Sequence, residues 1–325
     1  MLRQVALAVV ASGGTAVAGD TELDRATIVY ARGAAIYKND GKGKAEAELV
    51  PLANATTTVR ALHGDARGKV LLAELSSGWW WMPLDGKALV ALPQCHEGPA
   101  RLDPDGECVL CRGASGGVIV NLASGRSTPV EAPATAHIVG SGAQRKLVWP
   151  DASGIWSAPL ADPKRKTRVA PEPPLRAFVP SHDGARAVAV YPSFVHEGRQ
   201  QRPADALMSF ALDGEAARRK TIRGGIPLEW SHDNQWVLVQ EGPAACLMRA
   251  NGGQYKCWKG FTAVSIAPDG SYALVLGSRD GKSAPAPNGP LALYRARLDG
   301  VYDAPPQLVV RIVDGPAVWI RQSGT

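Results

Sequence analysis

Residues 267–281 read Ala-Pro-Asp-Gly-Ser-Tyr-Ala-Leu-Val-Leu-Gly-Ser-Arg-Asp-Gly, and residues 293–300 read Leu-Tyr-Arg-Ala-Arg-Leu-Asp-Gly. Asp-Gly pairs favour tight turns, and the apolar run between the first two has the length of a β-strand. The two stretches therefore predict a turn, a strand, a second turn and a second strand that ends in a third turn.

This strand-and-turn plan recurs along the chain. Strands that end in a turn lie at 78–86, 118–125, 154–162, 207–214, 246–252 and 293–300. A second landmark, a turn before an apolar run, lies at Gly68, Gly106, Arg145, Gly184, Asn234 and Gly270. The intervals are roughly 40 residues, so one repeat holds about four short strands, the size of one propeller blade.

The two ends of the chain supply a seventh repeat. Residues 27–30, 34–37 and 48–50 read as strands, and 315–319 resembles 98–102, an innermost strand. Pairing the N-terminal strands with the C-terminal strand in one blade protects sheet edges and closes a ring. We predict an all-β, seven-bladed β-propeller with about 44 residues per blade. A pair of β-sandwiches is the alternative, but it does not need such regular repetition.

At these residues the chain resembles the TolB-like propeller repeat, a relative of the WD-repeat. The likeness covers Gly64 to Gly300 and is strongest in the fourth and sixth repeats. In the third repeat, residues 141–144 replace Pro-Asp-Gly. The resemblance concerns the propeller only, since too few residues precede it to hold the α/β domain of TolB. It implies an exported scaffold or interaction module, usually without catalysis of its own.

The N-terminus has the features of a secretory signal. Arg3 is followed by an apolar stretch at 5–11 and by small residues at Ala16 and Ala18, in the order that signal peptidase requires. We expect residues 1–18 to be a signal peptide and 19–325 a single propeller domain in the periplasm or outside the cell. A first β-strand is the alternative, and the protein would then be cytoplasmic. The chain has no 18-residue apolar run, so we expect no transmembrane segment.

Composition argues for a globular protein and against nucleic acid as a partner. Of the 325 residues, 45% are apolar and 20% are charged, which suffices for a sizeable core. The net charge of +6 is spread along the chain rather than concentrated in a stripe. The basic runs at 164–166 and 218–220 are read as solvated faces.

Five cysteines occur, an odd number that leaves at least one thiol unpaired within the chain. Cys246 and Cys257 flank the Asn251-Gly252 turn symmetrically, so a two-residue hairpin sets them opposite each other. They are our disulfide candidate, with two packed free thiols as the alternative. Cys108 and Cys111 point to opposite faces of a strand, which favours buried thiols over a zinc site.

Turns between first and second strands should gather near the propeller axis. They carry the residues His63, Asp65, Asp105, His182, Asp183, His232, Asp233 and Asp269. Asp and Gly are what such turns require, and no histidine spacing typical of a metal site is present. We therefore expect no catalytic residues, metal or cofactor here. Trp79, Trp80 and Trp81 are interpreted as inter-blade packing, with sugar stacking by Trp79 and Trp81 as the alternative.

Two long connections between second and third strands are the candidate binding elements. Long loops on a rigid scaffold are where recognition usually occurs, although a tolerated insertion explains them as well. The connection at 193–205 carries His196, Arg199 and Arg202, and the connection at 277–290 carries Arg279, Asp280 and Lys282.

The sequence thus predicts an exported, non-catalytic binding module that recognises a protein partner through these loops. The alternative is a lactonase-like propeller hydrolase with a metal at the central axis. Elemental analysis, with a thermal shift measured with and without chelator, separates the two.

Overall fold

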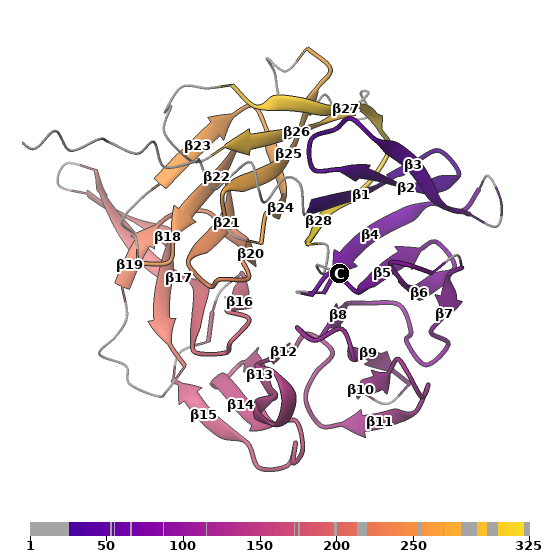
Figure 1. The fold of residues 1–325 in the computed structure, drawn as a ribbon. Helices are drawn as coiled ribbons and strands as arrows, with labels where there is room; N and C mark the ends of the chain where they lie inside the picture. The colour runs from indigo at the N-terminus through magenta and orange to yellow at the C-terminus, as the bar shows by residue number, and fades with distance from the viewer. Residues whose placement is uncertain are drawn as a thin grey trace, which may run out of the picture.

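Seven four-stranded antiparallel sheets surround a common centre (Figure 1). The computed structural model describes residues 26–321, apart from 53, 55, 66, 87, 115, 172, 175, 198–199, 213–219, 252–254, 269, 281–290 and 298–304. The predicted seven-bladed β-propeller is confirmed. The expected signal peptide at 1–18 lies outside the described residues.

We number the blades in chain order and give the strands of each from the centre outward. Blade 1 consists of β4 (Val59–Gly64), β5 (Val70–Leu75), β6 (Gly78–Pro83) and β7 (Val90–Ala91). Blade 2 consists of β8 (Ala100–Leu102), β9 (Cys108–Gly113), β10 (Gly116–Asn121) and β11 (Ser127–Val130). Blade 3 consists of β12 (His137–Val139), β13 (Lys146–Asp151), β14 (Gly154–Pro159) and β15 (Thr167–Ala170). Blade 4 consists of β16 (Phe178–Pro180), β17 (Arg186–Glu197), β18 (Gln200–Ala211) and β19 (Lys220–Arg223). Blade 5 consists of β20 (Ile226–Trp230), β21 (Trp236–Glu241), β22 (Ala244–Arg249) and β23 (Tyr255–Lys259). Blade 6 consists of β24 (Thr262–Ile266), β25 (Tyr272–Ser278), β26 (Leu291–Arg297) and β27 (Gln307–Val313). Blade 7 consists of β28 (Ala317–Arg321), β1 (Ala26–Arg32), β2 (Ala35–Asp40) and β3 (Glu46–Pro51).

Blade 7 joins the two ends of the described chain, as the sequence predicts. Strand β28 pairs antiparallel with β1, from Ala26 opposite Arg321 to Tyr30 opposite Ala317. The ring of Trp319 stacks on Tyr272 of blade 6, with ring centroids 5.8 Å apart. Since β28 is bonded to β1 and also packed against blade 6, it closes the ring and covers the inner edge of β1.

The hydrophobic core lies between the blades rather than in one central mass. Seven buried clusters each combine residues of two neighbouring blades. In β17, Ala187 and Ala189 belong to the cluster shared with blade 3, whereas Val188 and Val190 belong to the one shared with blade 5. Successive side chains of a strand point to opposite faces, so each middle strand contributes to two interfaces.

The three consecutive tryptophans follow this rule. Trp79 is buried between blades 1 and 2, and its indole N–H donates to the carbonyl oxygen of Gly98 at 3.0 Å. Trp81 packs against the same cluster, and Trp80 packs on the other face, between blades 7 and 1. Their packing agrees with the inter-blade interpretation, and the burial of Trp79 leaves it no face on which a sugar could stack.

Candidate functional site

The innermost strands of all seven blades surround a central channel. It contains a cavity of about 270 Å³ whose wall includes both apolar and titratable side chains. The polar members are His63, Asp65, Arg101, Asp103, His137, His182, Glu229 and Ser265. Several of these residues, notably Arg101, His137 and Glu229, are absent from the candidates that the sequence suggests.

Backbone register explains how these side chains reach the channel. The same turn recurs in five blades, in which a backbone N–H donates to the carbonyl oxygen of the residue five positions later. The donors are Asp65, Asp103, Ser181, Ser231 and Ala267. The residues two positions before these turns all line the cavity, and they are His63, Arg101, Val179, Glu229 and Ser265. A side-chain period of two therefore places one residue of each inner strand in the wall at this level.

The channel histidines lie in a desolvated environment. Burial, together with the positive charge of Arg101, lowers the pKa of His63 to about 4. The same two causes hold the pKa of His137 well below its usual range. Burial also lowers the pKa of His182, whose Nε2 lies 3.0 Å from the carbonyl oxygen of Trp230. At neutral pH these imidazoles are uncharged and each retains one N–H donor.

Glu229 is an acidic residue of the channel wall and lies on the inner strand β20. Burial raises its pKa from the usual 4.5 to about 7, against the opposing effect of hydrogen bonds from Ser265 and the Ile266 backbone. The Ile266 N–H donates to Oε2 at 3.0 Å. Near neutral pH the carboxyl group of Glu229 is therefore divided between its protonated and ionised forms.

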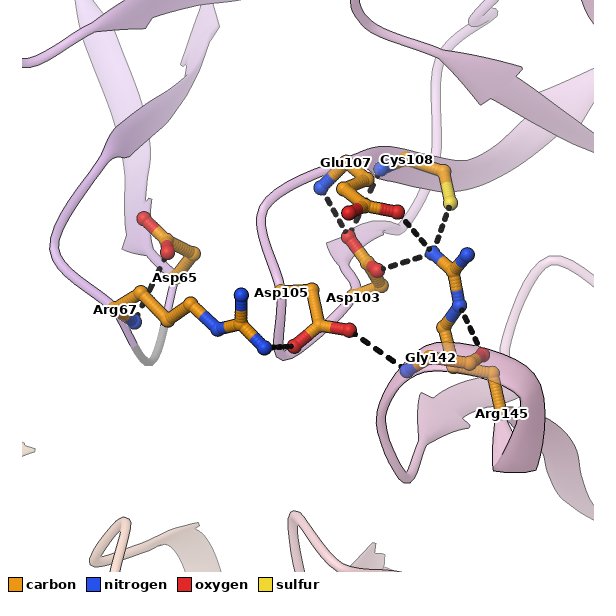
Figure 2. Close-up of polar contacts among 8 residues, drawn as sticks. All are labelled: Asp65, Arg67, Asp103, Asp105, Glu107, Cys108, Gly142 and Arg145. Carbon is orange, nitrogen blue, oxygen red and sulfur yellow. Dashed lines mark hydrogen bonds and ion pairs between the residues drawn. The ribbon is translucent and has the colours of Figure 1, made fainter.

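The aspartates near the axis hold turns and neighbouring blades together (Figure 2). Asp65 accepts hydrogen bonds from the backbone N–H groups of Arg67, Lys69 and Val70 within its own turn. Asp105 lies 2.6 Å from the Arg67 guanidinium of blade 1 and accepts from the Gly142 N–H of blade 3 at 3.0 Å. These carboxylates are thus committed to structure, as turn chemistry requires.

A second group in Figure 2 connects blades 2 and 3. One oxygen of Asp103 accepts from the N–H groups of Glu107 and Cys108, at 2.7 and 2.8 Å, and the other lies 2.9 Å from Arg145. The Arg145 guanidinium also lies 3.0 Å from Glu107. Arg145 follows a single turn of 3-10 helix, η1 (Gly142–Gln144), which takes the place of Pro-Asp-Gly in this blade.

The repeated Ser-His-Asp segments are turn structures as well. Asp183 accepts from the Ser181 hydroxyl and the Ala185 N–H, and Asp233 accepts from the Ser231 hydroxyl and the Gln235 N–H. The rings of His182 and His232 lie 4.7 Å apart between blades 4 and 5. Asp269, the remaining residue of the predicted gathering, lies outside the described residues.

The prediction of a long loop at 193–205 is wrong, because most of this segment forms paired strands. Strands β17 and β18 pair over twelve residues each, and Pro192, Phe194 and Pro203 all lie within the ladder. A β-hairpin therefore extends from blade 4 where a loop was expected. His196 lies in β17 opposite Gln201, and Arg202 lies in β18 opposite Val195. Arg199 lies outside the described residues.

The second predicted loop is only partly described. Arg279 and Asp280 are exposed in the turn that follows β25, and the hydroxyl of Ser278 donates to the Asp280 carboxylate. Lys282 lies outside the described residues. The two sets of candidate residues come from blades 4 and 6, with blade 5 between them.

The structure joins Cys246 to Cys257 in a disulfide, and these residues are direct partners in the β22–β23 ladder. A second disulfide joins Cys95 to Cys111, where the sequence favours a buried thiol at Cys111. The His96 N–H donates to the Arg112 carbonyl at 2.7 Å, so the segment before β8 lies beside the end of β9 and brings the two sulfurs together. Cys108 is free and buried, and burial raises its pKa to about 12.

Metal-ligand geometry does not appear at the axis within the described part of the chain. Among the described residues, the side chains whose ligand atoms converge lie away from the axis, on β21 to β23 of blade 5, and they are Glu241, Cys246 and Cys257. The disulfide between the two cysteines removes both thiolates as ligands. The described part of the chain contains no helix that is long and apolar enough to cross a membrane.

Comparison with known proteins places the chain among propellers by fold alone. No family model matches the chain, and no curated protein matches it in sequence. The structure of dihydro-heme d1 dehydrogenase NirN in complex with DHE matches with a TM-score of 0.51 and 14% identity, over 93% of this chain and 76% of that one. Hsv2 from Kluyveromyces lactis matches with a TM-score of 0.50 and 9% identity, over 76% of this chain and 75% of that one. At such identities the likeness supports the β-propeller fold and carries no function.

Proposed function

We propose that this protein is an exported, TolB-like β-propeller that binds a protein partner without catalysing a reaction. The observation that carries the proposal is the hairpin of β17 and β18. Its strands have twelve residues each, whereas the corresponding strands β21 and β22 of the next blade have six. The extra length builds no part of the blade, and it presents Phe194 with 62% of its surface exposed.

Further apolar residues on the same face support a docking role. Ile226 pairs with Gln240 close to the β21–β22 turn, which corresponds to the β17–β18 turn in the preceding blade. Ile226 and Leu228 are 45% and 40% exposed. Leu228 also lines a cavity of about 420 Å³ together with Pro174 and Arg176 of blade 4. Exposed apolar residues that gather beside a projecting element are typical of protein-binding surfaces.

Export is supported by two separate features. The order of Arg3, the apolar stretch at 5–11 and Ala16 to Ala18 is that of a cleavable signal. Two disulfides in one chain are typical of proteins that fold in an oxidising compartment. N-terminal sequencing of the mature protein should therefore begin at Gly19, and an intact Met1 in the exported fraction would contradict this.

The binding proposal is tested by shortening the hairpin. Replacing residues 194–203 with Asn-Gly keeps the Ser193–Ala204 pair and closes it with a two-residue turn. Crosslinking of the tagged, exported protein identifies partners of the intact chain, and the strongest is then purified and titrated calorimetrically. We expect the shortened protein to fold with an unchanged melting temperature and to lose the partner. Equal affinity for both proteins would refute the hairpin as the docking element.

A matched variant separates the apolar contact from the backbone. Phe194→Ser retains the hairpin and its ladder but removes the most exposed ring that the structure shows there. If the ring is an anchor, this variant should weaken binding by about tenfold or more, since buried aromatic anchors dominate interface energies. Full affinity with F194S but none with the shortened hairpin would assign recognition to other residues of the hairpin.

A further inference from the structure

The wall of the channel contains a cation that has no hydrogen-bond or ion-pair partner among the described residues. Arg101 is in the middle of β8, and in the described chain its Nε atom is buried with no hydrogen-bond partner. No ion pair involves Arg101 in that part of the chain, although Arg67 and Arg145, at the neighbouring turns, are both paired with aspartates. Leaving a guanidinium group desolvated and unpaired is costly, so its presence in a cavity calls for a ligand.

The neighbours of Arg101 complete a donor site. His63 in blade 1 and His137 in blade 3 flank it in the ring of blades, and both line the same cavity. The His63 ring stacks on Trp79 with centroids 6.0 Å apart, and the His137 ring meets the edge of Phe178 at 5.9 Å. These contacts hold both imidazoles in place, and the His137 ring is also hydrogen-bonded to the backbone of Phe178. The Arg101 guanidinium and the His63 ring are therefore the donors positioned before any ligand arrives.

We propose that the channel binds a small apolar monocarboxylate, whose carboxylate pairs with the guanidinium of Arg101 between His63 and His137. The planar guanidinium matches a carboxylate with two parallel N–H donors. This inference goes beyond the protein-binding function proposed above, because it concerns the channel wall and not the hairpin.

The charge of the site selects a monoanion. Arg101 contributes one positive charge, while both flanking histidines are neutral at pH 7. The carboxylates of Asp65 and Asp103 also line the cavity, but Asp65 is bound by three N–H groups of its turn and Asp103 by two such groups and by Arg145. Glu229 belongs to blade 5, three blades from Arg101 in a ring of seven, and becomes negative as it ionises. A dianion such as inorganic phosphate therefore meets one cation and a potential repulsive charge, whereas a monocarboxylate is matched.

The rest of the cavity wall selects an apolar body. It is lined by Leu62, Leu102, Ile138, Val179, Val264 and Val318. A cavity of about 270 Å³ holds a small organic acid, and a concave wall that combines apolar surface with placed polar groups is typical of small-molecule sites. Benzoate is a suitable probe because it combines one carboxylate with a compact apolar ring.

The test is a titration of the full protein with benzoate, benzamide, acetate and phosphate in a chloride buffer. Binding is followed by calorimetry and by the NMR signals of the His63 and His137 rings. We expect benzoate to bind more tightly than acetate, and benzamide and phosphate to bind at least about tenfold more weakly, since charged hydrogen bonds are lost or mismatched. The imidazole signals of His63 and His137 should shift on binding.

Variants assign the effect to Arg101. Arg101→Met should weaken benzoate binding by about tenfold or more, and Arg101→Lys should give intermediate affinity because it keeps the charge but not the planar donor pair. Arg126→Met makes the same chemical change at an exposed site and should bind like the wild type. Melting temperatures and near-UV circular dichroism verify that each variant is folded.

Several results would overturn the proposal. These are the absence of benzoate binding at millimolar concentrations, affinity of the folded R101M variant within twofold of wild type, and equal binding of benzamide or phosphate. Binding that leaves the His63 and His137 signals unmoved would place benzoate elsewhere on the molecule and would equally reject the channel site.

Discussion

The guanidinium of Arg67 lies 2.6 Å from the carboxylate of Asp105, which belongs to the next blade. The second oxygen of that carboxylate accepts from the Gly142 N–H of the blade after that (Figure 2). One buried aspartate thereby connects three consecutive blades on the side of the ring where the first and second strands are joined. The sequence explains Asp105 as a turn residue, but its main contacts are with other repeats.

Replacing Asp105 should destabilise the ring in a graded way. Asp105→Ala removes both contacts and leaves the Gly142 N–H without its acceptor, so we expect a loss of about 1–3 kcal/mol in the free energy of unfolding. Asp105→Asn keeps an oxygen for Gly142 and should lose less. Arg67→Met serves as the control, since the side chain of Arg67 is 50% exposed and such pairs contribute about 0–1 kcal/mol. Urea unfolding measures all three, and equal losses for D105A and R67M would contradict this order.

The thiol count of the protein is also fixed by the structure. Five cysteines occur, four are joined in two disulfides, and Cys108 is free. With its pKa raised to about 12 by burial, the thiol of Cys108 stays protonated and unreactive at pH 8. We expect a thiol reagent to label no cysteine in the native protein and one after unfolding without reductant. Labelling of three or five after unfolding would show that one or both disulfides are absent.

Glu229 should make stability depend on pH with a definite sign. Its carboxyl group holds a proton to about pH 7 in the folded chain, whereas it releases it near 4.5 when unfolded. The resulting stabilisation is complete below pH 4.5 and is lost as the pH rises to 7, by up to about 3 kcal/mol. Glu229→Gln lacks this dependence.

The measurement compares urea unfolding of the wild type and E229Q between pH 4.5 and 8. The histidines of the channel titrate in the opposite sense but are present in both proteins, so they cancel in the difference. The wild type should lose stability relative to E229Q across this range. A difference that does not change with pH would place the titration of Glu229 outside this window.

Arg101 should be a residue that lowers stability. Because its buried Nε has no partner in the described chain, Arg101→Met removes a desolvated charge and keeps a long apolar stem. We expect the variant to be more stable than the wild type by about 1 kcal/mol in the absence of ligand. Benzoate should raise the melting temperature of the wild type but not of R101M. A clear loss of stability in R101M would show that Arg101 supports the fold.

The ring of blades is predictable from the sequence because its turns recur at regular intervals and their residues are required by backbone geometry. Closure is predictable because 315–319 resembles an inner strand. The residues that line the channel are predictable from the same repeat, although the motifs in the sequence single out the turn residues instead. Position two before each turn faces the channel, so the repeat alignment alone contains the signal for Arg101 and Glu229.

Other features are not readable from local patterns. The hairpin of β17 and β18 contains Pro192 and Pro203, residues that normally argue against strands, so it looks like a loop in the sequence. The disulfide between Cys95 and Cys111 depends on how the segment before β8 lies beside β9. That placement is a tertiary contact between an irregular segment and a strand, and no spacing rule in the sequence expresses it.

The pairing of β1 with β28 also has a consequence during protein synthesis. Strand β1 leaves the ribosome early, but its inner neighbour β28 follows only after six other blades have been translated. Until then the nascent chain carries an unpaired inner edge that is open to aggregation. A stalled or prematurely terminated product that lacks residues 317–321 keeps this edge exposed, so cellular quality control has a physical feature by which to separate incomplete chains from finished ones.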